Sequence, residues 1–155
     1  MKISNLKHQP GFASIIADRA WNAWWTESGV TLEEYRAHLD PMISGIGVPF
    51  ALVAHRGDTY AGSVLVIEHD HDARPQYSPW IAALWVEPEF RRQGLAARLL
   101  TAARSEAATD TVSCCYLCAA PDKQAYYLKQ GFRLIESNVN GLDIFVIGEP
   151  LSRER

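Results

Sequence analysis

The sequence of 155 residues lacks long hydrophobic runs and has little excess charge of either sign. No window approaches the roughly 18 consecutive apolar residues of a membrane-spanning helix. Residues 1–7 have no apolar stretch like that of a secretion signal, so a cytoplasmic location without membrane association is expected. A formal net charge of -3, with no basic stripe, argues against nucleic acid as a partner. With 48% hydrophobic and 21% charged residues, the composition is that of a folded globular domain.

Cysteine is also scarce, and all three cysteines lie within residues 113–119. An odd number of cysteines without an export signal favours free thiols over disulfides. Cys115 and Cys118 form a Cys-x-x-Cys pair, but no second ligand pair follows and the segment is predicted to be a buried strand. Core packing is therefore favoured over redox or zinc chemistry, and no metal is expected. The His-Asp-His-Asp run at 69–72 is likewise interpreted as a solvated loop before Pro75.

No repeat or linker divides the chain, which indicates one domain over residues 1–149 and a short polar tail over 150–155. Apolar periodicity predicts strands over 2–6, 49–56, 59–68, 80–86, 112–119, 132–139 and 143–148, and helices over 11–25, 31–39, 97–108 and 123–130. This order predicts an α/β fold with a mixed sheet.

Local signals support several of these boundaries. Thr31 and Glu34 have the spacing of a capping box at the start of the second helix, and Pro41 is expected to bound that helix. The dipeptides at 57–58 and 140–141, Gly-Asp and Asn-Gly, predict hairpin turns between neighbouring strands.

The most informative segment joins the strand at 80–86 to the helix at 97–108 through a basic loop at 91–96. Backbone N–H groups at a helix start have no intrahelical partner and carry a partial positive charge, so they bind phosphate oxygens. Gly94 lets the backbone come close to such a ligand, and Arg91 and Arg92 add positive charge. The segment therefore predicts a phosphate site.

The spacing Arg91-x-x-Gly94-x-Ala96, after a strand that ends Leu-x-Val-x-Pro, resembles the acyl-CoA pyrophosphate loop of the GNAT superfamily of N-acetyltransferases. Residues 79–88 are similar to the fourth strand of a bacterial branch of that superfamily whose acceptors are mostly unassigned. The resemblance implies a GNAT-like mixed sheet with the order β-α-α-β-β-β-α-β-α-β-β. It also implies that the fourth and fifth strands, at 80–86 and 112–119, splay apart.

The same resemblance implies acetyl-CoA as cosubstrate, no metal, and an amine as acceptor. The residues expected to contact the cofactor are Leu84, Trp85, Val86, Arg91, Arg92, Gln93, Gly94, Leu95 and Ala96. Backbone groups around Leu84 and Val86 are expected to pair with the pantetheine arm as if it were an extra strand.

Residues 125–132, Ala-Tyr-Tyr-Leu-Lys-Gln-Gly-Phe, resemble the late aromatic-Tyr-x-Lys-x-Gly-Phe segment of the superfamily. The match places Tyr127 where a tyrosine faces the cofactor sulfur, and a phenol with a pKa of about 10 can protonate the departing thiolate. Tyr126 is expected to be structural. An asparagine that often precedes this tyrosine is absent, and Asp122, Lys123 or Gln124 could replace it.

The attacking amine must lose a proton, but the glutamate frequent on the fourth strand of the family has no counterpart in the apolar run at 81–84. Candidate bases bordering the acceptor site are Glu27, Glu68, His69 and Asp70, with a water chain as the alternative. Trp25 and Glu27, between the first two helices, are the residues expected to hold the acceptor by ring face and charge.

These features together predict an N-acetyltransferase that moves an acetyl group from acetyl-CoA to a primary amine of a small molecule or peptide by direct attack. One alternative is an acyl-CoA-binding sensor without turnover, because the family's glutamate and asparagine are missing. The other, less favoured, is a redox or zinc protein built on Cys115 and Cys118. The acceptor, the acyl length and the choice between monomer and homodimer stay open.

Overall fold

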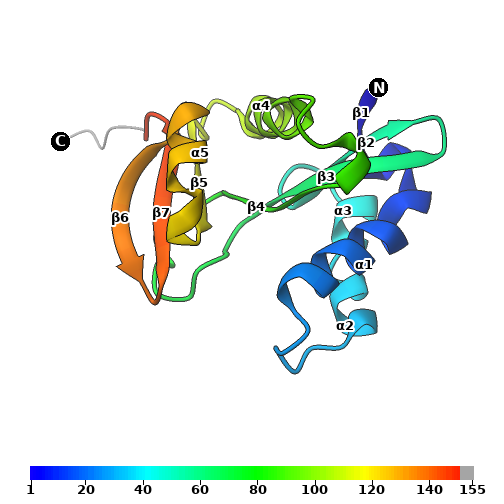
Figure 1. Ribbon diagram of the computed structural model, residues 1–155, viewed down its shortest axis with the longest axis horizontal. Coiled ribbons are helices and arrows are strands. Elements are labelled where there is room, and N and C mark those ends of the chain that lie inside the picture. The colour runs from blue at the N-terminus through cyan, green and yellow to red at the C-terminus, as the bar shows by residue number, and fades with distance from the viewer. Residues whose placement is uncertain (151–155) are drawn as a thin grey trace.

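One seven-stranded mixed sheet, in the order β1-β2-β3-β4-β5-β7-β6, organises the fold (Figure 1). The computed structural model describes residues 1–150, so the predicted tail lies, from residue 151 on, outside the described residues. The strands are β1 (Lys2–Asn5), β2 (Phe50–Arg56), β3 (Thr59–Ile67), β4 (Trp80–Val86), β5 (Cys114–Ala119), β6 (Arg133–Val139) and β7 (Leu142–Gly148).

Helices cover both faces of this sheet. They are α1 (Ala13–Trp24), α2 (Leu32–Ala37), α3 (Asp40–Ser44), α4 (Leu95–Ala107) and α5 (Gln124–Lys129). Figure 1 shows α4 on one face and α1 to α3 together on the other, with α5 beside β5 and β7. The helices of the second face stand under β2 to β4, so the far end of the sheet, β5 to β7, projects away from them.

Strand alternation divides the core in two. In β2, Phe50, Leu52 and Ala54 face the core under α4, whereas Ala51 and Val53 face the core under α1. On α4, the buried residues recur along one side of the helix, at Leu95, Leu99, Leu100, Ala103 and Ala107. The sheet is therefore apolar on both faces where helices cover it, which explains the continuous apolar runs of β2 and β3.

The predicted order of α-helices and strands is confirmed, with one added α-helix, α3. The second helix ends at Ala37, and Pro41 lies in the first turn of the short helix α3 instead of bounding α2. Proline fits this position because the first helical N–H groups have no intrahelical acceptor. The capping box of Thr31 and Glu34 is also confirmed, with both reciprocal hydrogen bonds present.

The splay of β4 and β5 is confirmed as well. These parallel strands are in register at only one position, Trp80 with Tyr116, near the start of β4. On its other side β4 follows β3 but skips register between Ser63 and Leu65 of that strand, and Ala83 has φ 52. This bulge brings Ile81, Leu84 and Val86 to the same core, although simple alternation would separate Ile81 from the other two.

Candidate active site

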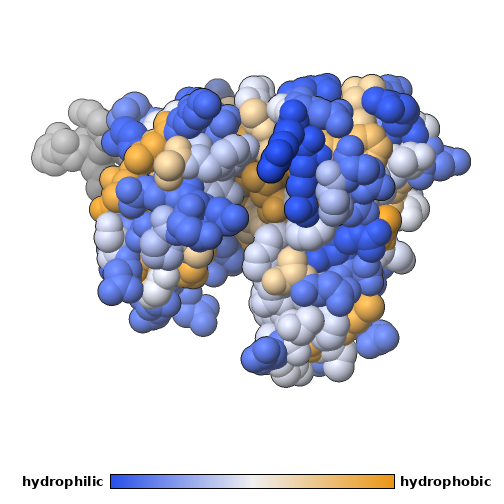
Figure 2. All heavy atoms as spheres, viewed as in Figure 1, coloured by the Kyte–Doolittle hydropathy of each residue, from blue (hydrophilic) through white to orange (hydrophobic). Residues whose placement is uncertain are grey.

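A deep cleft opens where β4 and β5 part. Its volume is about 1720 Å³, and it is lined by residues of α1, α2, β4, α4, β5 and α5 together with the segment between β3 and β4. Figure 2 shows it as a notch between the part of the molecule that carries β6 and α5 and the part that carries α1 and α2. The fold therefore leaves room for a large ligand where β4 and β5 keep only one register pair.

The start of α4 borders this cleft and has the features of an anion site. Gly94 precedes the helix in the left-handed conformation, with φ 78, and no side chain caps the helix start. A Cβ atom added at Gly94 would meet nothing within 4 Å, so the space over this backbone is open. The free N–H groups of the first turn are consequently accessible to phosphate oxygens.

Most residues predicted to bind the cofactor line the cleft. They are Leu84, Trp85, Val86, Arg91, Arg92, Gly94, Leu95 and Ala96. Gln93 does not line it, because its amide Nε2 turns back and donates to the carbonyl of Glu89 at 3.3 Å. The β5-facing edge of β4 beyond Trp80 has no register partner, so the backbone near Leu84 is open toward the cleft.

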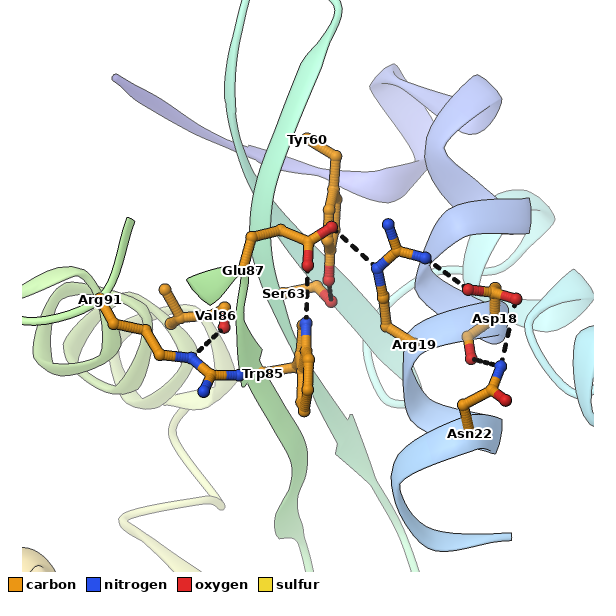
Figure 3. Close-up of polar contacts among 9 residues, drawn as sticks. All are labelled: Asp18, Arg19, Asn22, Tyr60, Ser63, Trp85, Val86, Glu87 and Arg91. Atoms are coloured by element: carbon orange, nitrogen blue, oxygen red, sulfur yellow. Dashed lines mark hydrogen bonds and ion pairs between the residues drawn. The ribbon is translucent and has the colours of Figure 1, made fainter. Parts of the chain in front are cut away.

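The two arginines of the loop are placed differently. Arg91 folds back along β4: its Nε donates to the carbonyl of Val86 at 2.7 Å, and its guanidinium lies 4.7 Å from the ring centroid of Trp85 (Figure 3). Arg92 is exposed and has φ 64. Arg91 therefore ties the loop to the strand, while Arg92, exposed like Arg91, takes no part in this contact.

A buried polar network, which sequence reasoning missed, holds the end of β4 against α1. Glu87 is only 8% exposed; it accepts from Arg19 Nε at 2.8 Å and from the indole Nε1 of Trp85 at 3.2 Å. Arg19 also pairs with Asp18, as Figure 3 shows. The sequence did contain a signal for this network: a carboxylate that directly follows a buried apolar strand is itself expected to be buried, and a buried carboxylate needs a positively charged or hydrogen-bonding partner.

Tyr127 lines the cleft from α5 and is half-buried. Its ring packs between Phe132 and Phe145, with centroids 5.6 Å away in each case. Burial raises the pKa of Tyr127 to about 12, so its phenol stays protonated at neutral pH and can donate. Tyr126 also lines the cleft but is more exposed, at 37%.

The residues that precede this tyrosine divide into two groups. Gln124 is occupied, since its amide Nε2 donates to Asp143 Oδ2 at 3.2 Å. Asp122 and Lys123 are exposed and line the cleft. Of the three candidates for the missing asparagine, these two are therefore placed to meet a ligand.

Of the two predicted acceptor residues, one lines the cleft. Trp25 lines the cleft, but Glu27 is exposed and lies outside its lining. Glu27 belongs to the turn after α1, where the chain leaves the cleft wall. Of the other candidate bases, His69 and Asp70 line the cleft and Glu68 does not.

Cys114 and Cys115 are buried, whereas Cys118 is partly buried and lines the cleft. Cys115 lies in the core under α4, and burial raises its pKa to about 11. Cys118 donates to Asp70 Oδ2 at 3.4 Å, and burial followed by the charge of Asp70 raises its pKa to about 12. The thiols of Cys115 and Cys118 are therefore protonated at neutral pH, whereas redox and metal chemistry need thiolates. Within residues 1–150, no three His, Cys, Asp or Glu side chains are grouped to hold a metal ion.

Comparisons with known proteins agree with this geometry. Residues 49–134 match the family model described as the acetyltransferase (GNAT) domain, and the chain belongs to this family of acetyltransferases. No curated protein sequence matches it significantly. Helices long and apolar enough to cross a membrane are absent from the described part of the chain.

Solved structures share the fold at low identity. An aminoglycoside 6'-N-acetyltransferase complexed with coenzyme A has 18% identity and a TM-score of 0.72, covering 99% of this chain and 100% of that chain. The aminoglycoside 6'-N-acetyltransferase from Enterococcus faecium has 18% identity, a TM-score of 0.70 and the same coverage of both chains, 99% and 100%. The PaiA N-acetyltransferase from Thermoplasma acidophilum, in complex with coenzyme A, has 14% identity and a TM-score of 0.66, covering 96% and 100%.

Proposed function

We propose that this acetyltransferase transfers the acetyl group of acetyl-CoA to a primary amine of a small molecule or peptide by direct attack. The observation that carries the proposal is one cleft that joins an uncapped helix start to an open strand edge. These two features suit the two ends of the same ligand, since one binds phosphate and the other pairs with amides.

The residues present fit acetyl-CoA. The pyrophosphate would lie over Gly94 at the start of α4, where the open space and the free N–H groups coincide, with Arg92 adding charge. The pantetheine amides would pair with the backbone of β4 around Leu84 and Val86. The solved enzyme with 18% identity that was crystallised with coenzyme A has the same fold, which supports this placement.

The chemistry needs a nucleophile, an oxyanion site and a proton for the leaving group. The amine nitrogen attacks the thioester carbonyl carbon, and a backbone N–H near Leu84 or Trp85 would stabilise the oxyanion. The attacking nitrogen loses a proton to water, the C–S bond breaks, and the departing thiolate takes a proton from Tyr127, whose phenolate then regains a proton from water. The protonated state of this phenol at neutral pH supports that role.

One observation favours a second candidate, an acyl-CoA-binding sensor without turnover. The wall of β4 is apolar from Ile81 to Leu84, so the strand offers no carboxylate to accept the amine proton. In that case acetyl-CoA would bind and no amine would be acetylated.

The test combines calorimetry with a turnover assay. Acetyl-CoA is titrated into the purified protein, and release of the coenzyme A thiol is then followed with a panel of primary amines. Binding with amine-dependent release is the expected result. Binding without release for any amine would identify the sensor, and absence of binding would overturn both candidates.

A further inference from the structure

The half of the cleft that lies away from α4 has an aromatic wall. Trp24 and Trp25 reach it from the end of α1, Tyr35 from α2, and Trp85 from β4. Trp24 meets Trp85 edge to face at 6.4 Å, and Trp25 is tilted against Tyr35 at 5.4 Å. Trp24 nevertheless remains 52% exposed and lines the cleft, so a ligand in the cleft can reach it. Contact between this wall and an apolar part of a ligand would remove apolar surface from water, which favours binding.

A carboxylate reaches the same half of the cleft from the segment between β3 and β4. Asp70 lines the cleft and accepts the Cys118 thiol at 3.4 Å, which leaves its remaining lone pairs for a ligand. Burial and then the charge of Asp70 raise the pKa of Tyr35 to about 12, so the carboxylate acts on the aromatic wall as well. Asp70 therefore stands between β5 and the wall.

The segment that carries Asp70 is fastened to β6. His71 Nε2 lies 2.9 Å from the carbonyl of Val139, and Arg74 Nε donates to both carboxylate oxygens of Glu136 at 2.9 Å. Tyr77 donates to the same carboxylate. These bonds join the segment between β3 and β4 to β6, so they limit the movement of Asp70. A carboxylate that is held in place before the ligand arrives loses less entropy on binding.

The charges around this half of the cleft do not suit a polycation. Besides Asp70, the cleft lining between α1 and β5 has one further carboxylate, Asp72, and three histidines, His38, His69 and His71, while the guanidinium of Arg91 lies over the ring of Trp85. The third carboxylate of the cleft lining, Asp122, lies on the α5 side next to Lys123. One held carboxylate beside aromatic rings matches a single ammonium on an apolar body, whereas several ammonium groups would need several acids.

We propose that the acceptor is a monoamine with an aromatic or aliphatic body, its ammonium held by Asp70 and its body lying against Trp24 and Trp25. The assignment rests on the proposed N-acetyltransferase function and names its substrate class. Protein around the cleft removes water from Asp70 and raises its pKa, although the residue stays accessible through the opening. The same carboxylate can therefore accept the proton that the amine must lose before attack.

Three amines test the substrate class: 2-phenylethylamine, ethylamine and the polycationic kanamycin A. A buried phenyl group should raise kcat/KM about 10- to 100-fold for 2-phenylethylamine over ethylamine. Kanamycin A should be the poorest acceptor. Binding of each amine to the complex with coenzyme A, measured by calorimetry, should follow the same order.

Matched variants test the two contacts. Trp24→Ala should raise KM for 2-phenylethylamine about tenfold and leave KM for ethylamine unchanged. The control is Ile46→Ala, at a 92% exposed site outside the cleft lining. Asp70→Asn should weaken both amines, with Asp58→Asn in the β2–β3 turn as control. Acetyl-CoA affinity should be the same in all four variants, which also checks that each is folded.

The outcomes separate this inference from the proposed function. Preference for kanamycin A over 2-phenylethylamine, or equal loss of both monoamines in Trp24→Ala, would overturn the substrate class while turnover continues. If acetyl-CoA binds and no amine is acetylated, the proposed function fails. Calorimetry then still tests the amine-binding pocket. Selective binding of 2-phenylethylamine that depends on Trp24 and Asp70 would support the proposed substrate class, and unselective binding would overturn it.

Discussion

The guanidinium Nε of Arg19 and the carboxylate Oε1 of Glu87 lie 2.8 Å apart, and this pair joins α1 to the end of β4. The side chain of Glu87 is 11% exposed and that of Arg19 is 34% exposed, so the acid is the more desolvated partner. The hydrogen bond with Glu87 is the main cause that raises the pKa of Arg19. Since Glu87 also accepts from Trp85, the pair helps to orient a residue of the aromatic wall of the cleft.

Loss of this carboxylate should destabilise the fold. Glu87→Gln keeps the shape but removes the charge that compensates Arg19, and the free energy of unfolding in urea should fall by about 1–2 kcal/mol. The control is Asp18→Asn, at the outer side of Arg19 where the carboxylate is 40% exposed, and its loss should be under about 1 kcal/mol. Equal losses in the two variants would show that burial does not set the strength of the pair.

The start of α4 should be sensitive to any side chain at Gly94. Gly94→Glu places a carboxylate where the pyrophosphate would lie, and acetyl-CoA affinity measured by calorimetry should fall at least about tenfold. Gly57→Glu is the matched control, because Gly57 also has a positive φ, 59, and open space around it, but lies in the β2–β3 turn. Both variants should lose about 1 kcal/mol of stability from backbone strain. A loss of affinity in both would refute the assigned phosphate site.

The hydroxyl of Tyr127 should matter for turnover and not for packing. Tyr127→Phe retains the ring between Phe132 and Phe145, so stability and acetyl-CoA affinity should persist while kcat falls by about 100-fold. Tyr126→Phe should leave kcat nearly unchanged. Because the pKa of Tyr127 is about 12, its deprotonation should not limit the rate below about pH 11. The parent rate in Tyr127→Phe, where chemistry limits turnover, would make this tyrosine structural.

Glu136 should contribute to stability only while it is ionised. Hydrogen bonds from Arg74 and then Tyr77 lower its pKa from the ordinary 4.5 to about 2 in the folded state. This contribution is therefore complete above the unfolded pKa of 4.5 and is lost as the pH falls through 4.5 toward about 2.

Urea unfolding of the parent and of Glu136→Gln checks this dependence. The parent should be the more stable protein at about pH 6, and the difference should shrink as the pH is lowered to about 2.5. Glu149→Gln, at a side chain that is 86% exposed, is the control and should show no such trend. A difference that stays constant over this range would contradict the ionic contribution of Glu136.

Much of the fold could be predicted because its signals are local. The capping box at Thr31 depends on residues three apart, and the hairpin at 140–141 depends on a dipeptide that accepts positive φ, here 52 at Asn140 and 88 at Gly141. Pro41 was the exception. A proline can follow the end of one helix or begin the next with similar backbone angles. Here a new helix, α3, begins because Met42 packs into the core under α1.

The candidate site could be predicted only in part. The loop at 91–96 and Tyr127 are carried by contiguous motifs, and both border the cleft. Glu27 was expected beside Trp25, but neighbours along a turn diverge once the chain leaves the helix, and Glu27 lies outside the lining. Asp70 was one of several open candidates for the base, since the sequence does not say where a long loop returns to the cleft.

The sequence by itself determined the α/β order, the splay implied by the family resemblance and the glycine-containing helix start, because helix periods, turns and free N–H groups depend on residues close along the chain. Only the tertiary structure decided which charges meet: Arg19 with Glu87, 68 residues apart, and Asp70 with Cys118, 48 residues apart. Such pairs depend on how helices pack on the sheet and where the loop after β3 is fastened to β6. The half of the cleft with the aromatic wall is built from these contacts, and the half at the start of α4 mainly from local ones.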